Sequence, residues 1–181
     1  MLAVIGENVV DIMPAGHGMY RPCLGGSPFN VVIGAARRGI DVCYLSPLSQ
    51  DHFGQQFAGY LAENGARYGL PFFSSAPSSL AMVSVNAQQQ PQYSLYRSNI
   101  ADRAVSAEQQ IAALPGHCQV LHLGSLALEP EDAPRIRAVL QAAAQQQILI
   151  SVDINVRLNA VSDVSTYRSF LTEVTTLSQF I

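Results

Sequence analysis

Residues 24–39 read LGGSPFNVVIGAARRG, which predicts a tight glycine turn that leads directly into a helix. Ser27 is placed to cap the first free N–H groups, and Pro28 suits the first helical turn, where its missing donor is not needed. Gly39 supplies a left-handed end to the helix. Apolar side chains between these ends recur at helical spacing and indicate one buried face: Phe29, Val32, Ile33 and Ala36.

Asn30 is the informative residue of this helix, because it is polar, lies in the first turn and has apolar neighbours. Its amide is expected to face whatever the glycine turn approaches. Gly25 and Gly26 would let the backbone come close to a ligand, since neither residue carries a Cβ. The other interpretation is a plain turn followed by a solvated helix residue, and this segment alone leaves both interpretations open.

The composition indicates one soluble α/β domain. The chain has 181 residues, of which 49% are hydrophobic and 13% charged, which allows a substantial core. No apolar run approaches the roughly 18 residues of a membrane span, and the N-terminus lacks the features of a signal peptide. A net charge of −3 argues against a nucleic-acid partner. We therefore expect a cytoplasmic protein without a membrane or nucleic-acid partner.

The cysteine and lysine content argues against several kinds of functional site. Three widely spaced cysteines indicate reduced thiols, and they lack the paired spacing with histidines that a zinc site needs, so no metal site is expected. All ten basic residues are arginine. The absence of lysine excludes a Walker A loop, a protein-kinase strand lysine and a Schiff-base site within these residues.

Strands and helices alternate along the chain, which predicts right-handed βαβ units around a parallel sheet. The expected strands are 2–6, 42–46, 120–125 and 148–152, and the expected helices are 53–64, 107–114, 131–147 and 162–178. The helix at 131–147 ends in glutamines, without a left-handed terminator.

Asp11 is expected just past the carboxyl end of the first strand, where open α/β sheets bind ligands. Its carboxylate could accept hydrogen bonds from two hydroxyl groups, although a turn or cap aspartate is the other interpretation. A dinucleotide-binding oxidoreductase would need G-x-G-x-x-G directly after this strand, and the sequence after Gly6 does not provide it.

A second pattern predicts a small sheet that stands away from the main one. Residues 80–85 and 93–96 alternate apolar and polar side chains around a polar tip at 88–91, which is typical of a hairpin with one solvated face. Residues 13–24, expected as irregular or edge-strand chain, would complete this sheet. Arg97 ends the hairpin, where its guanidinium could clamp a polar ligand or simply be solvated.

Three polar side chains follow the last predicted strand. Asp153, Asn155 and Arg157 occupy alternate positions, so they would share one side of an extended chain. A carboxylate, an amide and a guanidinium that converge at a strand end are typical of a binding site.

These motifs, in this order, resemble the ribokinase-like (PfkB) family of carbohydrate kinases. The resemblance covers the whole chain and rests on Gly6-Glu7…Asp11, Gly25-Gly26-Ser27-Pro28-Phe29-Asn30, Asp51-His52-Phe53-Gly54, Tyr96-Arg97, Ala101-Asp102 and Asp153-Ile154-Asn155-Val156-Arg157. The last of these and Tyr96-Arg97 are most similar to the fructokinase and 2-keto-3-deoxygluconate kinase branch.

The resemblance implies a three-layer α/β sandwich with a mainly parallel central sheet and a small β lid, formed by about 13–24 and 80–98. It implies transfer of phosphate from ATP, with Mg²⁺, to a sugar hydroxyl. Asp11 and Asn30 would hold sugar hydroxyls, the Gly25-Gly26 pair would lie at the base of the lid, and Arg97 would contact the sugar from the lid. Asp153 and Asn155 would lie near the sugar, Arg157 near the transferred phosphate, and the lid would pair two copies into a homodimer.

One departure from the family pattern limits this expectation. Members carry a later Gly-Ala-Gly-Asp segment with the general-base aspartate, and residues 1–181 contain none. We therefore expect the amino-terminal, sugar-binding portion of one kinase domain, with the catalytic base and the ATP site beyond Ile181 and no appreciable kinase activity for this polypeptide alone. The alternative is a non-catalytic, sugar-binding remnant of such a kinase.

Overall fold

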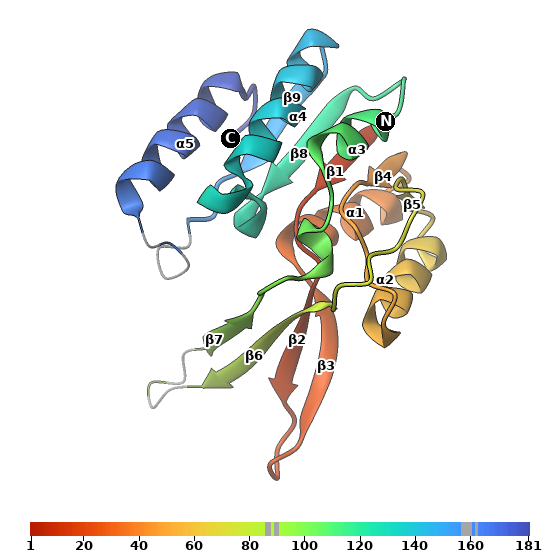
Figure 1. Cartoon of the computed structure of the whole chain (residues 1–181). Coiled ribbons are helices and arrows are strands. Elements are labelled where there is room, and N and C mark those ends of the chain that lie inside the picture. The colour runs from red at the N-terminus through yellow and green to blue at the C-terminus, as the bar shows by residue number, and fades with distance from the viewer. Residues whose placement is uncertain (86–87, 89–90, 157–160, 162) are drawn as a thin grey trace.

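The computed structural model describes residues 1–85, 88, 91–156, 161 and 163–181, which form two β-sheets (Figure 1). The main sheet has the order β5-β4-β1-β8-β9, and each neighbouring pair is parallel. Its strands are β1 (Leu2–Ile5), β4 (Val42–Tyr44), β5 (Arg67–Tyr68), β8 (Val120–Gly124) and β9 (Leu149–Asp153). The first strand is therefore central, as the apolar run predicted, whereas the short β5 was not predicted.

Helices cover both faces of the main sheet, which gives the expected three layers. On one face lie α1 (Ser27–Arg37) and α2 (His52–Glu63), and on the other α3 (Ala107–Ala112), α4 (Ala133–Gln145) and α5 (Val164–Leu177). Successive side chains of a strand point to opposite faces of the sheet, so each strand contributes to two separate hydrophobic cores. Val4 packs with Phe29 on the α1 side, whereas Ile5 packs with Ile136 on the α4 side.

The second sheet, here called the lid sheet, extends away from the helical layers (Figure 1). It has the order β3-β2-β6-β7 and consists of β2 (Val9–Pro14), β3 (Tyr20–Gly25), β6 (Ser79–Val85) and β7 (Pro91–Tyr96). The expected hairpin is confirmed, although 89 and 90 of its tip lie outside the described residues. Residues 13–24, expected as irregular or edge-strand chain that completes this sheet, include the edge strand β3, and they belong to an antiparallel hairpin whose strands pair from Val9–Gly25 to Pro14–Tyr20.

A buried polar cluster joins the two sheets at the point where β1 passes into β2. The amide of Asn8 donates to the Tyr44 hydroxyl at 2.9 Å and to the Pro47 carbonyl at 3.1 Å. The Tyr44 hydroxyl in turn donates to the Gly6 carbonyl at 2.6 Å. Because Asn8 and Tyr44 are fully buried, these bonds fix the direction in which the lid sheet leaves the core.

Two helix ends differ from the prediction. Gly26, with φ 106°, is the N-cap of α1, so Ser27 lies inside the first turn and does not cap it. The last turn of α4 does have a left-handed terminator, which is Gln147 with φ 58°.

Three short 3₁₀ helices, η1 (Ala101–Arg103), η2 (Ser125–Leu128) and η3 (Pro130–Asp132), connect the elements around the lid base.

Two further findings concern the described residues as a whole. None of their helices combines the length and apolar character needed to cross a membrane. Cys23, Cys43 and Cys118 are free thiols, as the odd and widely spaced cysteines predicted.

Candidate functional site

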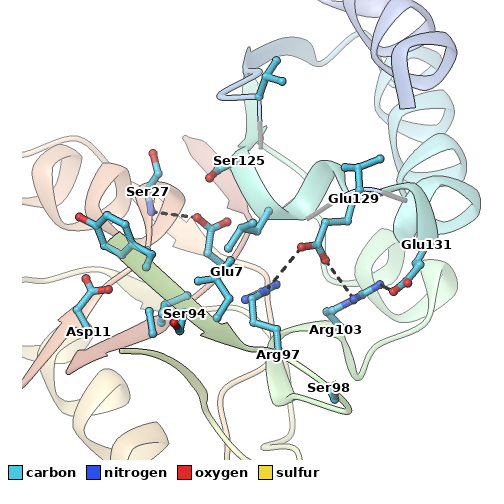
Figure 2. Close-up of a pocket in the computed structure, with 18 of the residues that line it drawn as sticks. Glu7, Asp11, Ser27, Ser94, Arg97, Ser98, Arg103, Ser125, Glu129 and Glu131 are labelled. Carbon is cyan, nitrogen blue, oxygen red and sulfur yellow. Dashed lines mark hydrogen bonds and ion pairs between the residues drawn. The ribbon is translucent and has the colours of Figure 1, made fainter. Parts of the chain in front are cut away.

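A cavity of about 1560 Å³ lies between the lid sheet, the N-terminus of α1 and the short helices η2 and η3 (Figure 2). Four residues singled out from the sequence line it: Asp11, Gly26, Asn30 and Arg97. Residues from the lid sheet and from the N-terminus of α1 therefore meet at one concave surface, which is where a small polar ligand would be enclosed.

Asp11 reaches the cavity from the lid sheet. It is the third residue of β2 and does not lie in a turn after β1, so the turn-aspartate interpretation was wrong. It pairs with Ala81 on β6, which pairs with Leu95 on β7, and this row of three residues lines the cavity. Partial burial raises the pKa of Asp11 above its usual value.

Gly25 and Gly26 allow close contact between the lid base and the start of α1. A Cβ on Gly25 would lie 2.6 Å from Asp11 Oδ2, and one on Gly26 would lie 2.3 Å from the Glu7 carbonyl oxygen. Both distances are shorter than van der Waals contact, so any larger residue would move a neighbour. The paired glycines therefore allow close approach between parts of the protein itself, whereas their predicted approach to a ligand stays a prediction.

Asn30 and Ser27 present polar groups from the first turn of α1. Asn30 is exposed and lines the cavity. The Ser27 backbone N–H donates to Glu7 Oε1 at 3.2 Å, so the positive end of the helix dipole meets a carboxyl group. Glu7 is only 3% exposed, and burial is the main reason that its pKa rises to about 7.

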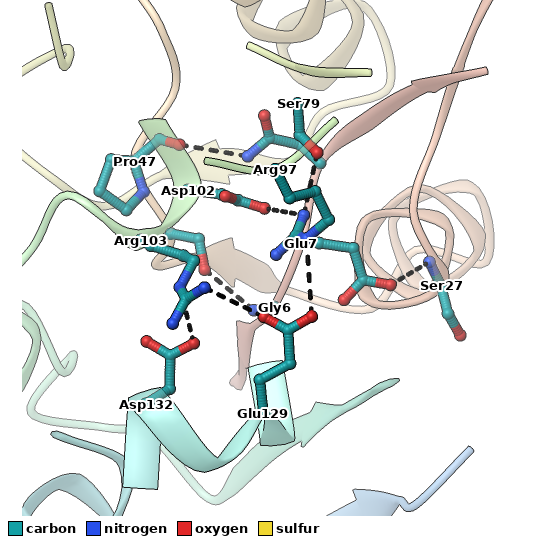
Figure 3. Close-up of polar contacts among 12 residues, drawn as sticks. Gly6, Glu7, Ser27, Pro47, Ser79, Arg97, Asp102, Arg103, Glu129 and Asp132 are labelled. Carbon is teal, nitrogen blue, oxygen red and sulfur yellow. Dashed lines mark hydrogen bonds and ion pairs between the residues drawn. The ribbon is translucent and has the colours of Figure 1, made fainter. Parts of the chain in front are cut away.

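Arg97 is buried in a network of carboxylates at the lid base (Figure 3). Its Nη1 donates to Asp102 Oδ2 at 2.9 Å and to the Ser79 hydroxyl at 3.0 Å, while its Nε lies 4.0 Å from Glu129 Oε1. The side chains of Arg97 and Asp102 are only 7% and 2% exposed. The solvated-edge interpretation of Arg97 was therefore wrong.

The network continues to η3 through Arg103. This side chain contacts Glu129 at 3.1 Å, Asp132 at 3.0 Å and Glu131 at 2.9 Å. Burial alone would lower the pKa of Arg97, but the Asp102 and Glu129 carboxylates more than offset this, so that its pKa is raised. The lid base is thus held to the main body by buried ion pairs.

Asp153 and Asn155 lie beside the cavity and support its wall. Asp153 Oδ2 accepts a hydrogen bond of 3.3 Å from the Ser27 hydroxyl, and Asn155 Nδ2 donates to the Ser125 hydroxyl at 3.4 Å. Asn155 has φ 36°, so the predicted extended alternation over 153–157 ends there. Arg157, predicted near a transferred phosphate, lies outside the described residues.

The sequence did not identify Glu7, Glu129 or Arg103 as residues of this site. Glu7 was quoted only as part of a motif, yet it lies between β1 and β2 and accepts a hydrogen bond from the first turn of α1. Glu129 and Arg103 belong to short 3₁₀ connections, whose positions no periodicity reveals. The one signal is a charged residue that follows a fully apolar strand and its closing glycine, as at Glu7.

Comparison with known proteins identifies the family. The family model for pfkB family carbohydrate kinases matches residues 18–179. Among curated relatives, fructokinase-1 of Zea mays is 30% identical over 167 residues, which cover 87% of this chain and 51% of that protein. Fructokinase of Solanum tuberosum is 29% identical over 168 residues, covering 87% and 52%. The chain therefore spans about half the length of the curated relatives it matches.

Solved structures share this fold. The fructokinase of Xylella fastidiosa superposes with a TM-score of 0.87 at 26% identity, covering 98% of this chain and 59% of that one. A second structure of that enzyme, with bound ATP, gives 0.86 at the same identity and coverage. Aminoimidazole riboside kinase of Salmonella enterica gives 0.80 at 21% identity, covering 98% and 57%, a likeness of fold alone.

Proposed function

Because the chain belongs to the pfkB family of carbohydrate kinases, we propose that it is the sugar-binding part of a fructokinase-like kinase. The whole protein would transfer phosphate from ATP to a hydroxyl group of a small sugar. The observation that carries this proposal is the cavity where Asp11, from the lid sheet, and Asn30, from α1, line one concave surface. Curated fructokinases among the relatives support the choice of fructose as the first sugar to test.

The two polar residues would hold the sugar by complementary hydrogen bonds. The Asp11 carboxylate accepts hydrogen bonds from two neighbouring hydroxyl groups, and the Asn30 amide both donates and accepts. Gly25 and Gly26 leave space for the Asp11 carboxylate and for the turn into α1. Arg97 would contribute from the cavity wall, because its Nε has no hydrogen-bond partner among the described residues.

The lid sheet would separate the sugar from water. Three of its strands contribute residues to the cavity: Val9 and Asp11 on β2, Ala81 on β6, and Tyr93 and Leu95 on β7. Water competes with a sugar hydroxyl as the acceptor of a phosphoryl group, so exclusion of water favours the productive transfer. Asp153 and Asn155 would help by orienting Ser27 and Ser125 in the wall.

The residues described here do not by themselves fit ATP and Mg²⁺. They contain no group of three histidine, cysteine, aspartate or glutamate side chains that could hold a metal ion. Arg97 and Arg103, which line the cavity, are paired with carboxylates and are poorly placed to neutralise a triphosphate. We propose ATP and Mg²⁺ only as cosubstrates of the whole protein and assign no step to them here.

Location and assembly are further proposals. A cytoplasmic protein is consistent with the free cysteines. A homodimer through the lid sheet is supported by aromatic side chains that the sheet leaves exposed, since Tyr20, Tyr93 and Tyr96 are 52%, 59% and 62% exposed. Sedimentation of the purified polypeptide would test this assembly.

Titration calorimetry of polypeptide 1–181 with D-fructose would test the proposed site. We expect heat of binding for the wild type, a loss of about tenfold or more in affinity for Asp11→Asn and Asn30→Ala, and no change for Glu63→Gln, an exposed residue on α2. Equal affinity in all four proteins would overturn the proposed site. Addition of ATP and Mg²⁺ should yield no sugar phosphate from this polypeptide, and turnover would contradict that expectation.

A further inference from the structure

Glu7 is a carboxyl group that the proposed sugar contacts leave unused. It follows Gly6 at the end of β1 and lines the same cavity as Asp11 and Asn30. Figure 2 shows its side chain between Ser27 and Arg97. One of its oxygens, Oε1, is occupied by the Ser27 backbone N–H at 3.2 Å.

The other oxygen of Glu7 has no such partner. Oε2 is buried and accepts no hydrogen bond from any side chain or backbone group in the described part of the chain. Two charged groups act on the pKa of Glu7. Arg97 lowers it by favouring the carboxylate, and Asp102 raises it by disfavouring the carboxylate. The Ser125 hydroxyl also lowers the pKa of Glu7, although its geometry toward Oε2 is not that of a hydrogen bond.

A purely structural role does not explain a carboxyl group at this position. The bond from Ser27 needs one acceptor oxygen, which a glutamine would supply equally well. Burial without a partner for Oε2 raises the pKa of Glu7 to about 7, so this oxygen is held in an unfavourable environment. A buried acceptor without a donor, in the wall of a cavity, is suited to a ligand that brings the donor.

We propose, on the basis of the proposed function, that Glu7 Oε2 accepts a hydrogen bond from a hydroxyl group of the bound sugar. Glu7 would then be a second carboxylate acceptor, on the main-body side of the cavity, opposite Asp11 on the lid sheet. A small torsional change of a side chain that is already in the wall would present Oε2 to the ligand. Sugars without a hydroxyl group at the matching carbon would lose this contact.

Calorimetric titration of the 181-residue polypeptide would test the proposal, with D-fructose and its monodeoxy analogues as the probes. At pH 8, where Glu7 is a carboxylate, we expect Glu7→Gln to weaken D-fructose binding about tenfold, because a neutral amide replaces the carboxylate acceptor. One monodeoxy analogue should bind the wild type and Glu7→Gln with equal affinity, since it lacks the hydroxyl group that Glu7 holds. Glu63→Gln, which removes one negative charge on α2, is the matched control and should bind like the wild type.

Three results would overturn the proposal in distinguishable ways. If Asn30→Ala loses affinity for D-fructose but Glu7→Gln does not, the role of Glu7 is wrong and the proposed site stands. If Glu7→Gln weakens D-fructose and every analogue by the same factor, its effect is indirect and the proposal also fails. If the wild type binds neither D-fructose nor any other sugar tested, both proposals fail together. Thermal unfolding checks that each variant folds, and Glu7→Met, which keeps the side-chain length, replaces Glu7→Gln if that variant does not.

Discussion

The Asp11 carboxylate lies directly against Gly25, so closely that a Cβ on this glycine would fall 2.6 Å from Asp11 Oδ2. The two residues belong to the paired strands β2 and β3 of the lid sheet. The absence of a side chain at position 25 therefore sets the position of the carboxylate that we propose as a sugar ligand. This relationship connects the glycine pair at the start of α1 with the cavity, and it can be tested directly.

Gly25→Ala should reduce sugar affinity with little effect on stability. The atom that the new methyl group meets is the end of a side chain, so the carboxylate rotates away while the backbone stays in place. We expect D-fructose affinity to fall about tenfold, with a change in unfolding free energy of about 0.5 kcal/mol or less. Calorimetry and urea unfolding measure the two quantities, and a large loss of stability with unchanged affinity would contradict this account.

Gly26→Ala should behave in the opposite way and destabilise the fold. Gly26 has φ 106°, and its Cβ would meet the backbone carbonyl of Glu7 at 2.3 Å, so that the start of α1 must move. We expect a loss of about 3 kcal/mol or more. Gly34→Ala is the matched control on the exposed side of the same helix, where a Cβ meets nothing within 4 Å, and it should stabilise by about 0.5–1 kcal/mol. Similar unfolding free energies for the two variants would refute the prediction.

The pKa of Glu7 predicts a pH-dependent stability. Burial raises this pKa from 4.5 to about 7, with Arg97 and Asp102 acting in opposite directions, so the folded protein keeps a proton that the unfolded chain releases. The contribution of Glu7 to the unfolding free energy therefore falls as pH rises from about 4.5 to 7, by about 3 kcal/mol in total. Glu7→Gln should remove this slope and be more stable than the wild type at pH 8. Parallel pH profiles for the two proteins would exclude a raised pKa.

Much of the fold was predictable because the signals are local. The alternation of apolar strands and amphipathic helices gave the parallel sheet, and Gly39, with φ 75°, ends α1 as expected. The lid sheet was predicted from the alternation in 80–96, but its β2–β3 hairpin was not. The strand pattern of this hairpin is interrupted by Pro14, Gly16, Gly18 and Pro22. The pairing of β2 with β6 is a long-range contact, which a local pattern does not report.

In the candidate site, only residues close to a recognisable strand or glycine turn could be predicted from the sequence. Asp11 and Asn30 are adjacent to a strand and a glycine turn, and both line the cavity. The partners of Arg97 were not predictable, because Asp102 and Glu129 reach it from short connections that are distant in sequence from each other. Sequence patterns report which face of an element is apolar, whereas the contacts of a buried charge depend on how the elements pack.

Arg97 should contribute far more to stability than an exposed arginine in an ion pair. Arg97→Met would leave the buried Asp102 carboxyl group without its hydrogen-bonded cation, and Glu129 with Arg103 as its remaining partner, at a cost of about 3–5 kcal/mol. The matched control is Arg67→Met, since Arg67 and its partner Asp41 are 51% and 56% exposed and the pair contributes about 1 kcal/mol or less. Urea unfolding of both variants measures the difference, and equal losses would show that the buried network does not hold the lid base.

Gln147→Gly should stabilise the protein, because Gln147 ends α4 in a conformation that glycine adopts without strain. Its φ is 58°, its N–H donates to the Ala144 carbonyl at 3.0 Å, and the N–H of Ile148 donates to the Ala143 carbonyl at 2.9 Å. These two bonds form the Schellman motif, in which the left-handed position is usually glycine. The helix therefore has its terminator, but glutamine occupies it at a conformational cost of about 1 kcal/mol. Gln147→Gly should raise the unfolding free energy by up to about this amount, whereas Gln145→Gly, inside the helix, should lower it by a similar amount. Because both substitutions remove the same side chain, a shift of the same sign in the two variants would show that the left-handed conformation at position 147 carries no such cost.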